Sequence, residues 1–176
     1  RQGRRMSRIV SDMLTLTRME RGADVFEAAP VDLSALADEL CRDMALIADK
    51  GISLAFEIEP GVTVDGDAAR LSRMLSNLIG NAYRYGRENG RIHVTLKRDA
   101  DEAVLTVADD GVGIAPENLE NIFERFFRSD ASRTRPGNGL GLALVRAIVR
   151  AHHGEITATS KLGEGSCFTV ELPKNC

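Results

Sequence analysis

Long apolar runs are missing from this chain. No stretch approaches the roughly 18 apolar residues that a membrane-spanning helix needs. The basic start, residues 1–5, is not followed by the apolar core of a secretory signal. We therefore expect neither a membrane-spanning nor a secreted chain. An initiator methionine is also missing, which predicts a piece of a longer protein.

Cysteine and histidine are scarce, with three of each. The cysteines (Cys41, Cys167 and Cys176) are odd in number and lack metal-ligand spacing. This excludes a disulfide scaffold and favours a reducing, cytosolic compartment. The net charge of −3 gives no reason to expect a nucleic-acid partner. Hydrophobic residues make up 43% of the 176 residues, enough for one packed domain with some chain left over.

The first twenty residues have the pattern of an amphipathic helix. Met6, Ile9, Met13 and Leu16 recur at spacings of three, four and three, as in a coiled coil. The pattern permits two interpretations, a seam for another helix or an ordinary helix on the domain's own core. We expect this first unit to span residues 1–22, a linker 23–30, and the main domain 31–174.

The rest of the chain alternates between strand and helix patterns. Helical spacing predicts helices over 34–50, over 68–85 with Asp67 as N-cap, and over 139–153, with a short helix from Pro116. Strands are expected over 31–33, 52–59, 62–64, 91–98, 103–108, 154–160 and 166–172. Because most of the strands pair as hairpins, we expect a two-layer α/β sandwich with a mixed, mostly antiparallel sheet. The polar stretch 129–138 is expected to be a flexible lid.

The first chemical motif lies near the end of the helix over 68–85. Asn77 and Asn81 share one helix face, and Arg84 follows one turn later. A neutral oxygen ligand suits Mg²⁺, which takes its other ligands from water and phosphates. The alternative is that both amides face solvent or bond locally.

Two further motifs follow strand patterns. Asp109 to Ile114 reads D-D-G-V-G-I, where a carboxylate at a strand end can accept a hydrogen bond from an adenine amino group. Alone, such a segment is more often a plain turn. Phe123 to Arg128 groups three phenylalanines with two arginines, and either core packing or a hinge for the lid explains them.

The last motif is a glycine run, G-N-G-L-G-L-A-L, over residues 137–144. Backbone amides at a helix N-terminus bind phosphate well. The P-loop pattern G-x-x-x-x-G-K-[ST] is missing, as are the H-R-D and D-F-G signatures of protein kinases. These absences disfavour two large nucleotide-binding classes.

In this order, the four motifs resemble the N box, first glycine box, F box and second glycine box of sensor histidine kinases. The resemblance runs from about Val31 to Pro173 and implies a Bergerat-type ATP-binding fold. Residues 4–20 resemble the end of the family's dimerisation and histidine-phosphotransfer helix. The F box and this helix favour a histidine kinase over the other ATPases of the fold.

The resemblance implies a role for each motif residue. It makes Asn81 the Mg²⁺ ligand with Asn77 assisting, and it implies that Arg84 and Arg128 act on the phosphates of ATP. Arg84 stands where the family usually has lysine. The other residues expected to bind the nucleotide are Tyr85, Asp109, Gly111, Gly113, Ile114, Gly137, Gly139, Leu140, Gly141 and Leu142.

One departure limits what the chain can do. The family's phosphoacceptor histidine lies in an earlier helix with an acidic neighbour, and His93, His152 and His153 do not match that pattern. We therefore expect a domain that binds Mg²⁺ and ATP and donates the γ-phosphoryl group to a histidine outside this chain. The phosphoryl group then passes to a response regulator aspartate.

The parent is expected to be a homodimer anchored in the inner membrane, with this part in the cytoplasm and without contact to membrane or nucleic acid. Two alternatives stay open. One is a serine-directed anti-sigma kinase or another ATPase of the same fold. The other is a regulatory module that binds nucleotide without catalysis.

Overall fold

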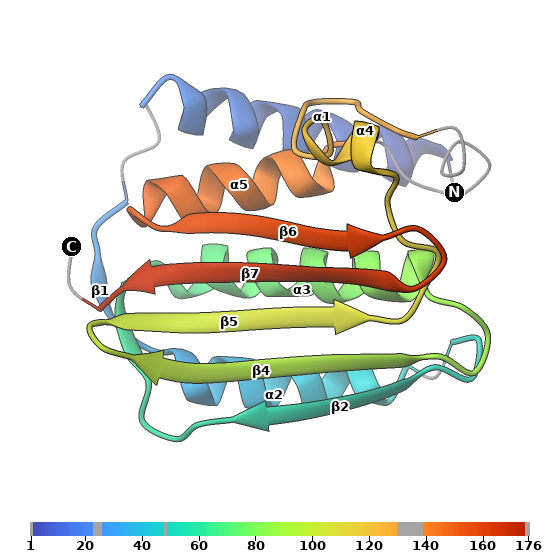
Figure 1. Cartoon of the computed structure of the whole chain (residues 1–176). Coiled ribbons are helices and arrows are strands. Elements are labelled where there is room, and N and C mark those ends of the chain that lie inside the picture. The colour runs from blue at the N-terminus through green and yellow to red at the C-terminus, as the bar shows by residue number, and fades with distance from the viewer. Residues whose placement is uncertain (1, 23–25, 48, 130–138, 175–176) are drawn as a thin grey trace.

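A five-stranded sheet with helices on one face forms the body of the molecule (Figure 1). The structure is a computed structural model that describes residues 2–22, 26–47, 49–129 and 139–174. The strand order is β2-β4-β5-β7-β6, in which β2 and β4 are parallel and the other neighbours antiparallel. The fold is therefore the two-layer α/β sandwich with a mixed sheet that the sequence predicts.

The strands are β1 (Ala29–Asp32), β2 (Ser53–Ile58), β3 (Thr63–Gly66), β4 (Arg91–Asp99), β5 (Glu102–Asp109), β6 (Glu155–Lys161) and β7 (Gly165–Pro173). The helices are α1 (Gln2–Glu20), α2 (Leu33–Ala45), α3 (Ala68–Tyr85), α4 (Pro116–Leu119) and α5 (Gly141–Ala151). Helices α2, α3 and α5 cover one face of the sheet, and α1 lies beside α5 (Figure 1). None of the described helices is both long and apolar enough to cross a membrane.

Alternating strand residues explain why the helices cover only one face. In β4, Ile92, Val94 and Leu96 are at most 1% exposed, while the residues between them face away from the helices. This period of two places apolar side chains on one face of a sheet. Leu71, Leu75 and Leu78 of α3 are buried in the same core.

Most of the predicted elements are confirmed, with shifted ends. The side chain of Asp67 caps α3 by accepting a hydrogen bond from the Arg70 N–H group at 3.0 Å. Part of the expected linker is wrong, because Ala29 and Pro30 pair with β3 as the start of β1. The C-terminal helix ends at Ala151, two residues earlier than expected. Of the predicted lid, residues 130–138 lie outside the described part of the chain.

Helix α1 packs one side against its own domain. Leu16 is 1% exposed and contacts Leu140 and Ala143, while Ile9 lies at the edge of this cluster. Ion pairs join Asp12 to Arg73 and Glu20 to Arg125. The four residues at coiled-coil spacing therefore do not share one environment, because Leu16 and Ile9 face the domain whereas Met6 and Met13 stay exposed. Four apolar side chains of α1 stay exposed: Met6, Val10, Met13 and Leu14.

His152 links the C-terminal end of α5 to the N-terminal end of α3. Its side chain is buried, with Nε2 accepting the Asp67 N–H group at 3.1 Å and Nδ1 lying 2.7 Å from the Ile148 oxygen. This geometry requires a neutral ring, which donates through Nδ1. The ring of Phe26 stacks on it at 4.6 Å. Burial lowers the pKa of His152, and the Arg70 and His153 charges act in the same direction.

We predict that His152→Gln lowers the free energy of unfolding at pH 7 and flattens its pH dependence between pH 7 and 5. Just below the ordinary pKa of 6.5, His152 binds a proton in the unfolded chain but stays neutral in the folded chain, where its pKa is lower. Stability from this group is therefore present above that pH and is lost as the pH falls, by at most about 1.4 kcal/mol per pH unit. Denaturant unfolding across this range measures it.

His93→Gln is the matched control, because His93 is exposed on the open face of the sheet. It should change the pH slope less than His152→Gln does. An unchanged slope in His152→Gln would contradict the assignment.

Candidate functional site

One pocket lies where α3 ends, α5 begins and β5 delivers Asp109. The pocket is partly open to solvent, and its cavity volume is about 110 Å³. The lining residues are Asn81, Arg84, Tyr85, Asp109, Val112, Gly113, Ile114, Asn118, Ile122, Phe127, Arg128, Ser129, Gly139, Gly141, Leu142, Ser166 and Phe168. Segments from all four sequence motifs therefore meet in one cavity.

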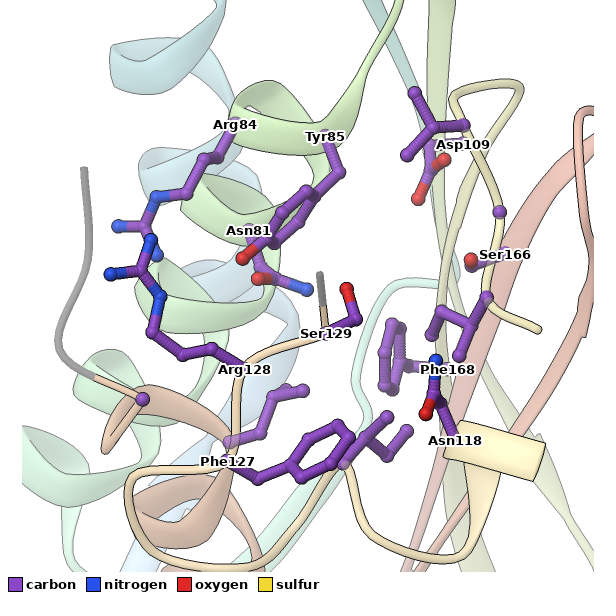
Figure 2. Close-up of a pocket in the computed structure, with 17 residues that line it drawn as sticks. Asn81, Arg84, Tyr85, Asp109, Asn118, Phe127, Arg128, Ser129, Ser166 and Phe168 are labelled. Atoms are coloured by element: carbon purple, nitrogen blue, oxygen red, sulfur yellow. The ribbon is translucent and has the colours of Figure 1, made fainter. Parts of the chain in front are cut away.

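Asp109 supplies a carboxylate on one side of the pocket (Figure 2). It is the last residue of β5 and pairs with Ser166 of β7. One carboxylate oxygen accepts the Gly111 N–H group at 2.9 Å. Burial raises the pKa of Asp109, and hydrogen bonds from the Gly111 and Ser166 backbones oppose that rise. The backbone thus holds the carboxylate in place and leaves acceptor capacity toward the pocket.

The loop after Asp109 needs glycine at two positions. A Cβ on Gly111 would lie 2.1 Å from the Tyr85 oxygen, so only glycine permits this approach to the end of α3. Gly113 has a φ of +72°, and its Cβ would lie 2.2 Å from the Lys161 oxygen. Both close approaches fix the loop between α3 and the β6–β7 turn.

The last turn of α3 brings three polar side chains to the pocket. Asn81, Arg84 and Tyr85 follow one another along the lining (Figure 2). The backbone of this turn is held from outside, because Lys50 Nζ donates to the Tyr83 oxygen at 3.1 Å and to the Arg84 oxygen at 3.0 Å. A cation at this position satisfies carbonyls that a helix end leaves open.

Positive charge gathers on the side opposite Asp109. Arg84 and Arg128 both line that side of the pocket, while Asp109 and Ser166 lie on the other side (Figure 2). Arg128 comes from the segment after Phe123, whose ring packs edge-on against Phe168 at 6.3 Å. The two sides suit a ligand with hydrogen-bond donors at one end and negative charge at the other.

The loop between Arg128 and α5 is closed at its base. The Phe126 N–H group donates to the Gly139 oxygen at 2.9 Å. Gly139 and Gly141 then line the pocket at the start of α5. At Gly141, an added Cβ would meet no atom of the described residues within 4 Å, so nothing in that part of the chain covers this helix start.

Ten of the predicted site residues line the pocket, and three of the described ones do not. Asn77 lies one turn before Asn81 and is outside the lining, and Gly111 acts through its contact with Tyr85. The side chain of Leu140 is fully buried against Leu16 of α1, so it anchors the start of α5 behind the pocket and is not part of the lining. Gly137 lies outside the described residues.

Sequence reasoning missed seven lining residues: Val112, Asn118, Ile122, Phe127, Ser129, Ser166 and Phe168. Ser166 is the most informative. Its hydroxyl lies 2.8 Å from that of Ser160, which also accepts the Ile114 N–H group at 2.7 Å. The sequence predicts the hairpin that contains Ser166, but residue spacing does not predict that the second strand of this hairpin pairs with the strand that ends at Asp109.

The geometry agrees with a known family. The model of the histidine kinase-, DNA gyrase B- and HSP90-like ATPases matches residues 66–175 of this chain, which include α3, the Asp109 loop and α5. The chain belongs to this family. Within it, the domain is of the sensor histidine kinase type, as three similar proteins show.

The sensor histidine kinase RppB of Synechocystis sp. is 40% identical over 98% of this chain and 39% of that protein. The structure of the mycobacterial sensor histidine kinase MprB has a TM-score of 0.75 at 30% identity, covering 85% of this chain and 99% of that one. Full-length ShkA in complex with AMPPNP has a TM-score of 0.84 at 33% identity, covering 98% of this chain and 36% of that one. The chain spans well under half the length of RppB.

We predict that Asp109→Asn weakens adenine-nucleotide binding by on the order of 1.5–3 kcal/mol, far more than Asp110→Asn. An asparagine oxygen would keep the bond from Gly111, which leaves its NH₂ group facing another donor on the base. Asp110 instead accepts the Arg91 N–H group at 2.9 Å outside the pocket, a bond that an amide oxygen preserves. Calorimetric titration of both variants measures the difference, and equal losses would contradict this register.

Proposed function

We propose that this histidine kinase-type ATPase domain binds Mg²⁺-ATP and donates the γ-phosphoryl group to a histidine on a helix outside residues 1–176. The observation that carries the proposal is the arrangement of one cavity with a half-buried carboxylate on one side and two arginines on the other. Adenine is a hydrogen-bond donor through its amino group, and the phosphates are anionic. ATP matches both sides.

The base is proposed to lie against Asp109, with its amino group donating to the carboxylate. The backbone bonds at Gly111 and Ser166 hold that oxygen pair before a ligand arrives, so little ordering is required on binding. Tyr85, Ile114 and Phe168 add apolar and aromatic surface for a flat ring. Such a lining excludes water from the base.

The phosphates are proposed to lie between Arg84, Arg128 and the start of α5. Two guanidinium groups offer forked donors to phosphate oxygens. The N-terminus of α5 adds the partial positive charge of a helix, and no side chain at Gly141 stands in front of it. In phosphoryl transfer most of the catalysis is such positioning and charge neutralisation.

The donor set fits Mg²⁺. Among the described residues, no group of three His, Cys, Asp or Glu side chains could hold a metal. Asn81 offers a neutral amide oxygen between the arginines and the side of the pocket that carries Asp109. Asn77 lies one turn earlier on α3. A hard cation that completes its shell with water and phosphate needs few protein ligands. When bound, it neutralises charge on the phosphates.

The wider role belongs to the parent protein. We propose a dimeric sensor anchored in the inner membrane, whose phosphohistidine serves a response regulator receiver domain, with this domain in the cytoplasm. The exposed face of α1 supports a helical partner, since Met6, Val10 and Leu14 are each more than half exposed. A non-catalytic module is less well supported, because all four sequence motifs are intact, whereas a module without catalysis should have lost at least one of them.

We predict that Asn81→Ala reduces the increase in ATP affinity that Mg²⁺ provides. The amide oxygen is the metal ligand that this helix face offers, while Asp109 and the arginines act on other parts of the nucleotide. Titration with and without Mg²⁺ separates the two contributions. Ser72→Ala, on α3 but outside this pocket, is the matched control. A metal contribution that is the same in Asn81→Ala and the unaltered chain would remove Asn81 from the site.

We predict that the chain binds ATP but does not phosphorylate itself on histidine. His152 is 2% exposed, both His152 and His153 lie at the far end of α5 from Gly141, and His93 lies on the open face of the sheet. A nucleophile that is not held in line contributes little. Incubation with γ-labelled ATP and an acid-lability assay measures it.

Transfer restored by adding the upstream helix of the parent would support the assignment. An acid-labile phosphate on the chain itself would overturn the prediction, and an acid-stable phosphoserine would favour a serine-directed kinase.

A further inference from the structure

Arg87 connects two loops at the base end of the pocket without lining it. It follows α3 by two residues, and its Nη2 atom donates to the Gly111 oxygen at 3.3 Å and to the Gly163 oxygen at 2.6 Å. Gly111 belongs to the loop after β5, and Gly163 belongs to the turn between β6 and β7. One side chain therefore bridges segments more than fifty residues apart in sequence.

The backbone already joins the same segments through Val112. Its N–H group donates to the Tyr85 oxygen at 3.1 Å, and its oxygen accepts the Gly163 N–H group at 2.8 Å. Val112 also lines the pocket. Two backbone hydrogen bonds thus hold the loop between α3 and the β6–β7 turn. Arg87 adds a side-chain connection between the same segments on the solvent side.

The backbone that carries Arg87 is itself fixed. The Arg87 oxygen accepts the Gly90 N–H group at 3.0 Å, which closes a turn over residues 87–90. Within that turn, the Asn89 N–H group donates to the Lys50 oxygen at 2.9 Å, and Lys50 holds the carbonyls at the end of α3. The guanidinium group is therefore anchored near both carbonyls rather than extended from a loose loop.

We propose that Arg87 is a positioning residue that sets the separation between the Asp109–Ile114 loop and Tyr85, and thereby how strictly the pocket discriminates between purine bases. The proposal rests on the proposed function, since it takes a purine nucleotide as the ligand. It goes beyond the four sequence motifs, because Arg87 lies outside all of them and does not line the pocket.

Removing the guanidinium group leaves both glycine carbonyls near the surface, where water can satisfy them. The fold is then nearly unaffected, but the loop has more freedom, and a bound base must order it. Affinity for ATP falls because of this ordering. Selectivity falls as well, because a looser loop adapts to a base with a carbonyl oxygen where adenine has its amino group.

The test compares Arg87→Met with Arg98→Met by calorimetric titration with ATP and with GTP, and by thermal unfolding. Arg98 is a matched control, since its Nη2 atom donates to the Gly61 oxygen at 3.1 Å near the opposite end of β4. For Arg87→Met we expect ATP affinity to fall about three- to tenfold, as for the net loss of one ordinary hydrogen bond, because water replaces the guanidinium group at the two carbonyls. The ratio of ATP to GTP affinities should fall too, with little change in melting temperature.

Arg98→Met should keep both the affinity and the ratio. Arg87→Lys, whose single ammonium group can reach one carbonyl, should recover part of the ATP affinity, and it serves as the test variant if Arg87→Met does not fold. An Arg87 variant with unaltered affinity and ratio overturns the inference alone, provided that the unaltered chain binds ATP. Absence of ATP binding by the unaltered, folded chain overturns the proposed function and this inference together.

Discussion

The close contact between the Asp109–Ile114 loop and the end of α3 is the constraint on which the pocket depends. Gly111 lies so close to the Tyr85 oxygen that any side chain would collide, and the Val112 N–H group bonds that same oxygen. Helix and sheet are thereby joined at one point. The carboxylate of Asp109 and the ring of Tyr85 face one cavity because of this junction.

From that junction the pocket extends toward α5, and its polarity changes along the way. The base side is held by backbone bonds to Asp109, whereas the other side carries the arginines and an open helix end. Fixed dipoles and charges of this kind stabilise a ligand without reorganisation at the moment of binding. The separation of the two sides supports a nucleotide rather than a uniformly polar small molecule.

Helix α1 adds a connection at the other side of the pocket. Leu16 packs on Leu140, which stands between the lining residues Gly139 and Gly141, and Glu20 pairs with Arg125. The expected seam is therefore not a free surface for another helix along its whole length. Spacing alone could not reveal this, since a coiled coil and a helix on its own core share the same period.

Features that depend on residues close together in the sequence could be predicted from the sequence alone. The period of two placed Ile92, Val94 and Leu96 in the core, Asp67 was recognisable as a cap, and the order of four motifs identified the ATPase family. The side chains of Ser166, Phe168 and Arg87 reach the pocket or its support only through strand register and loop contacts. Those contacts join residues far apart in the chain, so the sequence determined the chemistry of the motifs, while close packing of the tertiary structure decided which side chains meet around it.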